Sequence, residues 1–147
     1  MFYGEYKHAV DKKGRLTIPA KFRSLLKEKG IEALVVTRGY EKCLFVFPPD
    51  EWREYEQNLK SFSPHKINSR TVSRLFYSGA NFCSCDRQGR INVSENLLAY
   101  AGITKEVTII GTSSRFEIWD TTSWSKYREE HEKTFEEMAE RLELKID

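Results

Sequence analysis

The chain has 147 residues, of which 31% are charged, and its mean hydropathy is −0.60. No stretch approaches the roughly 20 apolar residues that a membrane-spanning helix needs, which excludes a helical membrane protein. The opening segment MFYGEYKHAVDKKGR lacks the apolar core of a signal peptide, so we expect a cytoplasmic protein.

The net charge of +2 is unevenly distributed along the chain. Residues 1–40 contain nine bases and four acids, and residues 60–78 contain four bases and no acid. Residues 126–147 contain five bases and eight acids, a net charge of −3. This asymmetry is typical of a protein that presents one face to a polyanion, although ordinary solvated faces would produce the same counts.

The three cysteines are Cys43, Cys83 and Cys85. An odd number without a signal peptide argues against a disulfide framework. A zinc site would need two further ligands at suitable spacing, and the histidines are scattered, so we interpret the cysteines as buried thiols. The sequence therefore predicts no metal and no cofactor.

The first half of the chain reads as strands and helices in alternation. Asp11 can bond its own backbone two residues on, and Gly14 can take a positive φ, so Asp-x-x-Gly-Arg predicts a hairpin turn. Proline suits the first turn of a helix, and glycine suits its end. The expected elements are strands at 7–11 and 15–18, a helix from Pro19 to Gly30, strands at 33–37 and 43–47, and a helix opened by Pro49.

Residues 61–68 read as a linker, and residues 70–77 as a short helix. The second half then repeats the order of the first, with Ser94 as the helix cap and Gly102 as the helix end. The expected elements are strands at 82–86 and 90–93, a helix, strands at 106–110 and 115–119, and a last helix that contains Trp124 and extends to about residue 144.

An internal repeat underlies this order. VDKKGRLTIP at 10–19 matches CDRQGRINVS at 85–94 with an offset of 75 residues, and Gly30-Ile31 matches Gly102-Ile103 with an offset of 72. The three-residue difference predicts that the helix of the first copy is about one turn longer. Each copy has about 45 residues, which is too few for a stable fold by itself, so we expect the two copies to share one core.

The fold class that follows is α+β, mainly β, with pseudo-two-fold symmetry between the tandem copies. Consecutive hairpins in half-size copies favour a closed or nearly closed barrel with the helices outside, because closure removes exposed sheet edges.

A cluster of positive charge at the turns is the candidate functional site. Lys12, Lys13 and Arg15 place three cations within four residues of a protruding turn, and a two-stranded ribbon can enter the major groove of DNA. Asp11 would repel phosphate, and we expect it to orient Arg15 or to cap the turn. The alternative is that each Asp–Arg pair only stabilises its turn.

The candidate DNA-contacting residues are Lys12, Lys13, Arg15, Lys21, Arg23 and Arg90, and the signature-turn residues are Asp11, Gly14, Asp86 and Gly89. Lys21 and Arg23 extend the charged patch along the following helix, although solubility alone would also explain them. Arg87-Gln88 stands where the first copy has Lys12-Lys13, so the two turns differ in charge.

The chain resembles the MraZ family of bacterial regulators, which belong to the AbrB-like swapped-hairpin class. The resemblance covers nearly the whole chain. It includes the opening MFYGEYKHAVDKKGRLTIPAKFR, the paired Asp-x-x-Gly-Arg turns, the GIT…V…I-I-G segment and the FEIW…W ending of the second copy.

This resemblance implies a double-split β-barrel built from two SpoVT-AbrB-like repeats. The implied divisions are a first repeat at 5–51, a helical linker at 52–78, a second repeat at 79–123 and an acidic C-terminal helix at 124–147. It also implies a nucleoid-associated transcription regulator that forms a ring-shaped homo-oligomer. Such a ring would bind double-stranded DNA at short direct repeats in the promoter of the division and cell-wall gene cluster.

Two other function classes remain open. A protein-interaction module, antitoxin-like or a scaffold ring, would use the acidic helix at 126–145 as its active surface. An enzyme is poorly supported, because the sequence has no GxSxG, Walker or dinucleotide-binding motif, and we therefore expect no small-molecule substrate.

Overall fold

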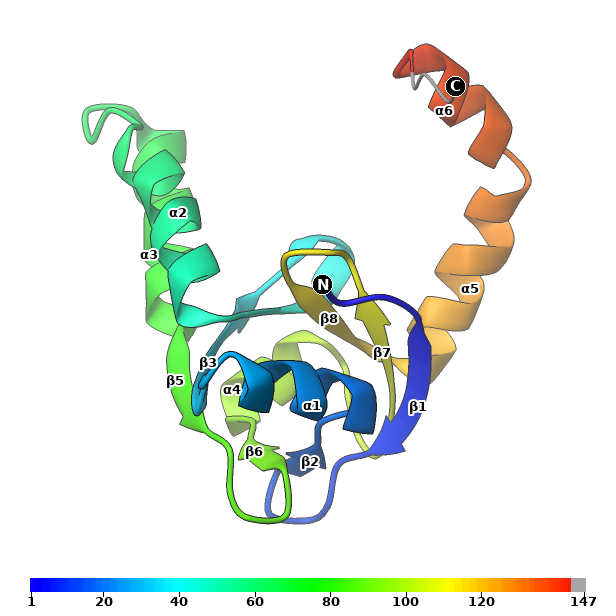
Figure 1. Cartoon of the computed structure of the whole chain (residues 1–147). Helices are drawn as coiled ribbons and strands as arrows, with labels where there is room; N and C mark the ends of the chain where they lie inside the picture. The colour runs from blue at the N-terminus through cyan, green and yellow to red at the C-terminus, as the bar shows by residue number, and fades with distance from the viewer. Residues whose placement is uncertain (144–147) are drawn as a thin grey trace.

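The computed structural model describes residues 1–143, so residues 144–147 of the expected acidic helix lie outside the described residues. A six-stranded sheet, a two-stranded sheet and the helices around them form the molecule (Figure 1). The strands are β1 (Glu5–Ala9), β2 (Arg15–Thr17), β3 (Ala33–Arg38), β4 (Leu44–Phe47), β5 (Asn81–Ser84), β6 (Arg90–Asn92), β7 (Glu106–Gly111) and β8 (Phe116–Asp120). The helices are α1 (Ala20–Glu28), α2 (Pro49–Lys60), α3 (Ile67–Gly79), α4 (Glu95–Tyr100), α5 (Thr121–Glu132) and α6 (Phe135–Arg141), with a 3₁₀ turn at Tyr40–Lys42.

The two sequence copies interleave in the large sheet, whose order is β1-β7-β8-β4-β3-β5. Pairing within a copy joins β3 to β4 and β7 to β8. Pairing between copies joins β1 to β7, β3 to β5 and β4 to β8, and all of these pairs are antiparallel. The copies therefore share one sheet, as their small size predicts.

The prediction of hairpins at 7–18 and 82–93 is wrong in its pairing. β1 and β2 each pair with a strand of the second copy, and β2 forms the small sheet with β6. Only one isolated bridge, Val10 to Leu16, joins the two strands that flank the first turn. Alternation of apolar residues shows which side chains face the core, but it does not identify the strand that pairs with them.

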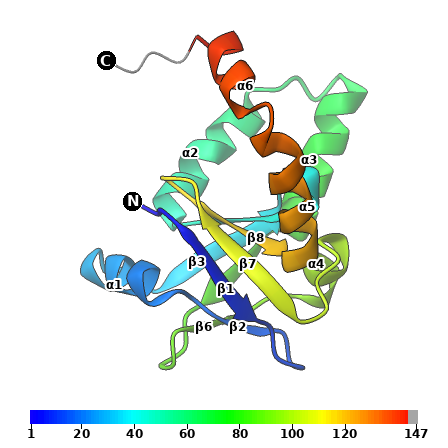
Figure 2. The same cartoon turned by 90° about the vertical axis from the view of Figure 1, so that its right-hand side faces the viewer.

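The expected closed barrel is not observed, because the large sheet is open and β1 and β5 are its two edges. The small β2–β6 sheet crosses beneath the open side, with α1 and α4 beside it (Figures 1 and 2). The architecture is therefore α+β with a mainly antiparallel sheet. The repeat also has the expected helix lengths, since α1 has nine residues and α4 has six.

Both faces of the large sheet are covered, which explains the continuous apolar runs in its central strands. Leu34 and Val36 belong to a core shared with α1, α4 and the small sheet. Val35 belongs to a second, aromatic core, which includes Phe47 and Trp52 and lies under α2 and α3. The buried hydroxyl of Thr37 donates to the carbonyl of Phe76 at 2.7 Å, so its polar atom is satisfied.

Two helical segments, α3 and the C-terminal helix, differ from the sequence prediction. The short helix expected at 70–77 is α3, which begins three residues earlier and ends two residues later. The single C-terminal helix is two helices, because Thr134, with φ −112° and ψ 11°, interrupts helical geometry before α6. Neither α5 nor α6 has a buried residue, so no core contact keeps the two helices in line.

Candidate nucleic-acid interface

The two signature turns, 11–15 and 86–90, protrude from one end of the molecule, opposite the long helices, and lie apart from each other on the two sides of the small sheet (Figures 1 and 2). The antiparallel pair β2–β6 lies directly behind them, with Leu16 opposite Ile91. This pairing continues into the turns, because the amide of Val93 donates to the carbonyl of Gly14 at 2.8 Å. Each turn is therefore positioned by the backbone of the other copy.

The carboxylate of Asp11 organises the first turn. Its Oδ1 accepts hydrogen bonds from the amides of Lys13 and Arg15, both at 2.9 Å. Its Oδ2 accepts a hydrogen bond from Nε of Arg15 at 2.7 Å. The residue both caps the turn and orients the arginine, which are the two roles expected of it.

The second turn has the same arrangement around Asp86. Oδ1 accepts from the amides of Gln88 and Arg90 at 2.9 and 2.8 Å, and Oδ2 accepts from Nε of Arg90 at 2.8 Å. Backbone amide donors, foremost that of the arginine, hold the pKa of each aspartate below its usual value, and the arginine side chain adds to this effect. Both carboxylates are therefore ionised at neutral pH.

The glycines of the turns are needed for conformation and for close contact. Gly14 has φ +82°, and a Cβ there would lie 2.6 Å from the carbonyl oxygen of Val93. Gly89 has φ +76°, and a Cβ there would overlap Cδ of Arg23. The turns of the two copies therefore pack against different neighbours.

The cations of the turns face solvent. Lys12 and Lys13 are exposed, and the side chains of Arg15 and Arg90 are 36% and 25% exposed. Among residues 1–143, Arg15 donates side-chain hydrogen bonds only through Nε, so its terminal nitrogens point to no protein acceptor. An arginine held in this way can present its free edge to a phosphate or to a guanine.

Arg87 is a functional candidate that the sequence analysis did not include among the DNA contacts. It is exposed on the second turn, and its place in the repeat corresponds to Lys12. The offset of 75 residues would have identified it, because it aligns each residue of one turn with its counterpart in the other.

Arg23 has a structural role that the sequence did not indicate. Its Nε donates to the carbonyl of Ile18 at 2.9 Å, and its side chain lies against Gly89 of the second turn. Lys21, like Arg23, is exposed on α1. The side chain of Arg23 therefore packs against the second turn and links it to the carbonyl of Ile18.

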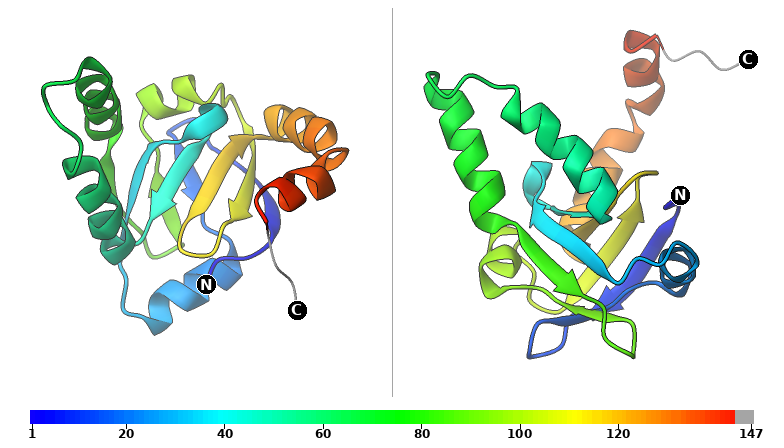
Figure 3. Two further views of the ribbon diagram at one scale, coloured as in Figure 1. Left: turned by 90° about the horizontal axis from the view of Figure 1, so that it is seen from above. Right: turned by 60° about the vertical axis from the view of Figure 1, so that its left-hand side comes forward.

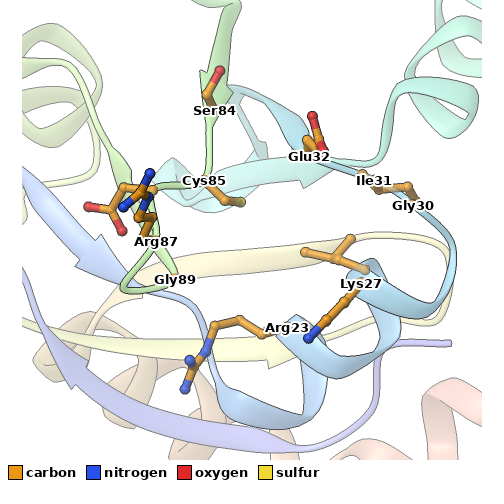
Figure 4. A pocket seen from close by; sticks show the side chains of 11 residues that line it. Arg23, Lys27, Gly30, Ile31, Glu32, Ser84, Cys85, Arg87 and Gly89 are labelled. Atoms are coloured by element: carbon orange, nitrogen blue, oxygen red, sulfur yellow. The ribbon is translucent and has the colours of Figure 1, made fainter.

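A groove of about 660 Å³ lies between α1 and the second turn (Figure 4). Its lining includes three cationic residues, Arg23, Lys27 and Arg87, and two acidic residues, Glu32 and Asp86. Cys85 also lines it, and burial together with the Asp86 carboxylate raises the pKa of this thiol. The corresponding groove beside the first turn is smaller, at about 270 Å³.

The two halves of the chain also match one family model, that of the MraZ protein, described as antitoxin-like, over residues 1–75 and 76–146. The chain belongs to the MraZ family. The boundary between the two matches agrees with the 75-residue offset of the signature turns. The tandem repeat of MraZ therefore coincides with the interleaved halves of the sheet, and it supports a regulator-like role.

Metal-ligand clusters and membrane-spanning helices are both absent from the described part of this MraZ-family chain. Within residues 1–143, no three His, Cys, Asp or Glu side chains gather as a metal site. No helix in this part of the chain is long and apolar enough to cross a membrane. Cys43 and Cys83 are buried, as predicted, and Cys85 is partly buried.

Proposed function

We propose that this protein is a transcription regulator that binds double-stranded DNA through its two signature turns. One observation supports this proposal most strongly: two turns with exposed cations protrude from the same end of the molecule, and one lies at each end of the β2–β6 pair that supports them (Figure 2). Lys12 and Lys13 supply point charges for phosphates, while Arg15 and Arg90 are oriented by carboxylates for bidentate contacts.

The proposed targets are short direct repeats in the promoter of the division and cell-wall gene cluster, the protein's own promoter included. One pair of turns offers few contacts, so an isolated subunit would bind weakly. A ring-shaped homo-oligomer would present many turns at once and raise the effective concentration of every later contact. Such a protein would be cytoplasmic and associated with the nucleoid.

Footprinting on the protein's own upstream region, at two salt concentrations, tests this function. We expect protection of several evenly spaced short elements and weaker protection at the higher salt. Arg15→Ala should reduce affinity roughly 5- to 150-fold, which corresponds to about 1–3 kcal/mol for a bidentate base contact. The control is Arg53→Ala, which removes an exposed arginine that pairs with Asp50 on the distant helix α2.

The proposal fails if the folded, assembled protein leaves its upstream region unprotected at low salt. It also fails if Arg15→Ala and Arg53→Ala bind alike. The proposal includes no catalysis, and DNA-independent turnover of an ester or nucleotide by the purified protein would contradict it.

A protein-interaction module is the second candidate, and the acidic helices α5 and α6 favour it because neither has a buried residue. A pull-down distinguishes the two functions. An interaction module would retain its partner after both signature turns are replaced by neutral ones and would lose it after removal of α6. A DNA-binding regulator would lose promoter binding when the signature turns are neutralised.

A further inference from the structure

Two helical arms extend from opposite sides of the sheet, away from the signature turns (Figures 1 and 3). The hairpin arm consists of α2, α3 and their connection, residues 49–79. The C-terminal arm consists of α5 and α6, residues 121–143. Both arms expose large apolar side chains, and the DNA-binding proposal uses neither of them.

The C-terminal arm ends in a helix that has no partner within the described residues. Phe135 and Leu142 are 65% and 81% exposed, and Met138 is also exposed. Their spacing of three and seven residues places them on one face of the helix. A seven-residue helix is not stable in water by itself, so this apolar face needs a surface to cover it.

The hairpin arm contains a groove of about 370 Å³ that is lined by apolar and basic residues. Its lining residues are Leu59, Lys60, Phe62, Pro64, Ser69, Arg70, Ser73, Arg74 and Tyr77. Phe62 is 51% exposed, and no acidic residue lines the groove. Arg70 donates to the carbonyl of Pro64 at 3.0 Å, which fixes one wall of the groove.

The charges of the two arms are opposite. Residues 60–78 contain four bases and no acid, whereas residues 126–143 contain four bases and seven acids. One base of the C-terminal arm, Arg128, is already paired with Glu5 and Glu132. The remaining acids therefore give the arm a negative field that attracts the basic groove.

We propose that the groove of the hairpin arm binds α6 of a second copy of this chain, with Phe135 and Leu142 against Phe62. The inference rests on the self-association that is part of the proposed function, and it names the surfaces responsible. The arms lie on opposite sides of one subunit, so α6 meets the groove of another subunit rather than its own (Figure 3).

This contact is heterologous, because two different surfaces meet. Each subunit then has one donor arm and one acceptor arm, and successive contacts produce a ring where the rotation between subunits closes. A groove-to-groove contact would place Lys60, Arg70 and Arg74 against the same bases of another copy. Like charges would oppose that symmetric alternative.

Oligomeric state measured without DNA, by native mass spectrometry and sedimentation of the full chain, tests the inference. We expect the wild-type protein to form assemblies, and Phe135→Ser or Phe62→Ser to yield single subunits of 17.3 kDa. An equimolar mixture of the two variants should form a dimer of twice that mass, because it retains one intact arm and one intact groove. Phe82→Ser is the matched control, since Phe82 is 71% exposed and lies on β5, outside both arms.

Four results would overturn the inference: a wild-type protein that is monomeric, variants that stay assembled, a mixture that stays monomeric, or dissociation by Phe82→Ser. Circular dichroism checks that each variant is folded. If Phe62→Ser does not fold, Lys60→Glu combined with Arg74→Glu replaces it, because both side chains are exposed. Adding Glu137→Lys and Glu140→Lys to the Lys60→Glu, Arg74→Glu variant reverses the charges of both surfaces and should restore assembly.

The outcomes for assembly and for DNA binding are separable. If the interface variants stay assembled while the wild-type protein protects its promoter, the arm contact is wrong and the proposed function stands. If the variants dissociate and complement each other while no DNA is bound, the arm contact stands and the proposed function is wrong.

Discussion

Ile18, in the first copy, donates its backbone amide to the carbonyl oxygen of Gly89, in the second copy, at a distance of 2.9 Å. An equivalent bond lies at the first turn, where the amide of Val93 donates to the carbonyl of Gly14 at 2.8 Å. Each signature turn thus ends the ladder of the β2–β6 sheet. The turns are parts of a shared core rather than independent loops.

Substitution of Gly14 in the first turn and of Gly30 after α1 should separate backbone strain from steric overlap. Gly30→Ala should cost about 1 kcal/mol, because Gly30 has φ +68° and open space around it. Gly14→Ala should cost at least about twice as much, because its Cβ would overlap a backbone oxygen as well. Urea denaturation measures both values, and equal losses would show that the overlap with Val93 has no effect.

Arg23 should stabilise the position of the second turn. Replacement of Arg23 by Met removes the donor to Ile18 and changes the packing against Gly89. We expect faster hydrogen exchange at the amide of Ile18, because this amide bonds to Gly89. Lys21→Met, on the exposed face of the same helix, is the control, and equal exchange rates in both variants would contradict this role.

The interleaved strands predict a single cooperative core. Leu16 and Ile91 face each other across the small sheet and are almost completely buried. Truncation of either residue to Ala should therefore cost about 2–5 kcal/mol and leave one unfolding transition. Calorimetry and circular dichroism measure the transition. Two separate transitions, one for each copy, would show that the copies fold independently.

The signature turns should be insensitive to pH until strongly acidic conditions. The pKa of Asp11 and of Asp86 lies below 3.8 in the folded protein, so the stability that each carboxylate contributes is complete above that value. The contribution is lost as pH falls through the lowered pKa. Amide chemical shifts of Lys13 and Gln88, which donate to these carboxylates, should stay constant from pH 7 to 5. A midpoint above 3.8 would refute this assignment.

The lysines of the first turn should change the salt dependence of DNA binding rather than its sequence preference. Lys12→Ala should lower the slope of log affinity against log salt by about one unit, since one phosphate contact is lost. Lys29→Ala, at the far end of α1, serves as the control because Lys29 contacts Met1 instead of the turns. Filter binding at several salt concentrations measures the slopes, and identical slopes would place Lys12 away from the phosphates.

The amino-acid sequence alone determined the repeat, most of the helices and strands, and the family. These features depend on local chemistry: an aspartate and a glycine in each turn, Pro19 at the start of a helix, and the alternation of Leu16 and Ile18. The role of Asp11 also followed from its own turn, because all of its partners are within four residues.

Only the tertiary structure decided which strands pair, which side of the sheet stays open and what Arg23 contacts. Each of these depends on residues far apart in the chain, such as Ile18 and Gly89, and a periodic pattern contains no information about such partners. The same reason explains the arms. Charge counts showed a basic and an acidic segment, but only the fold placed them on opposite sides of one subunit, where they can meet only in another copy (Figure 3).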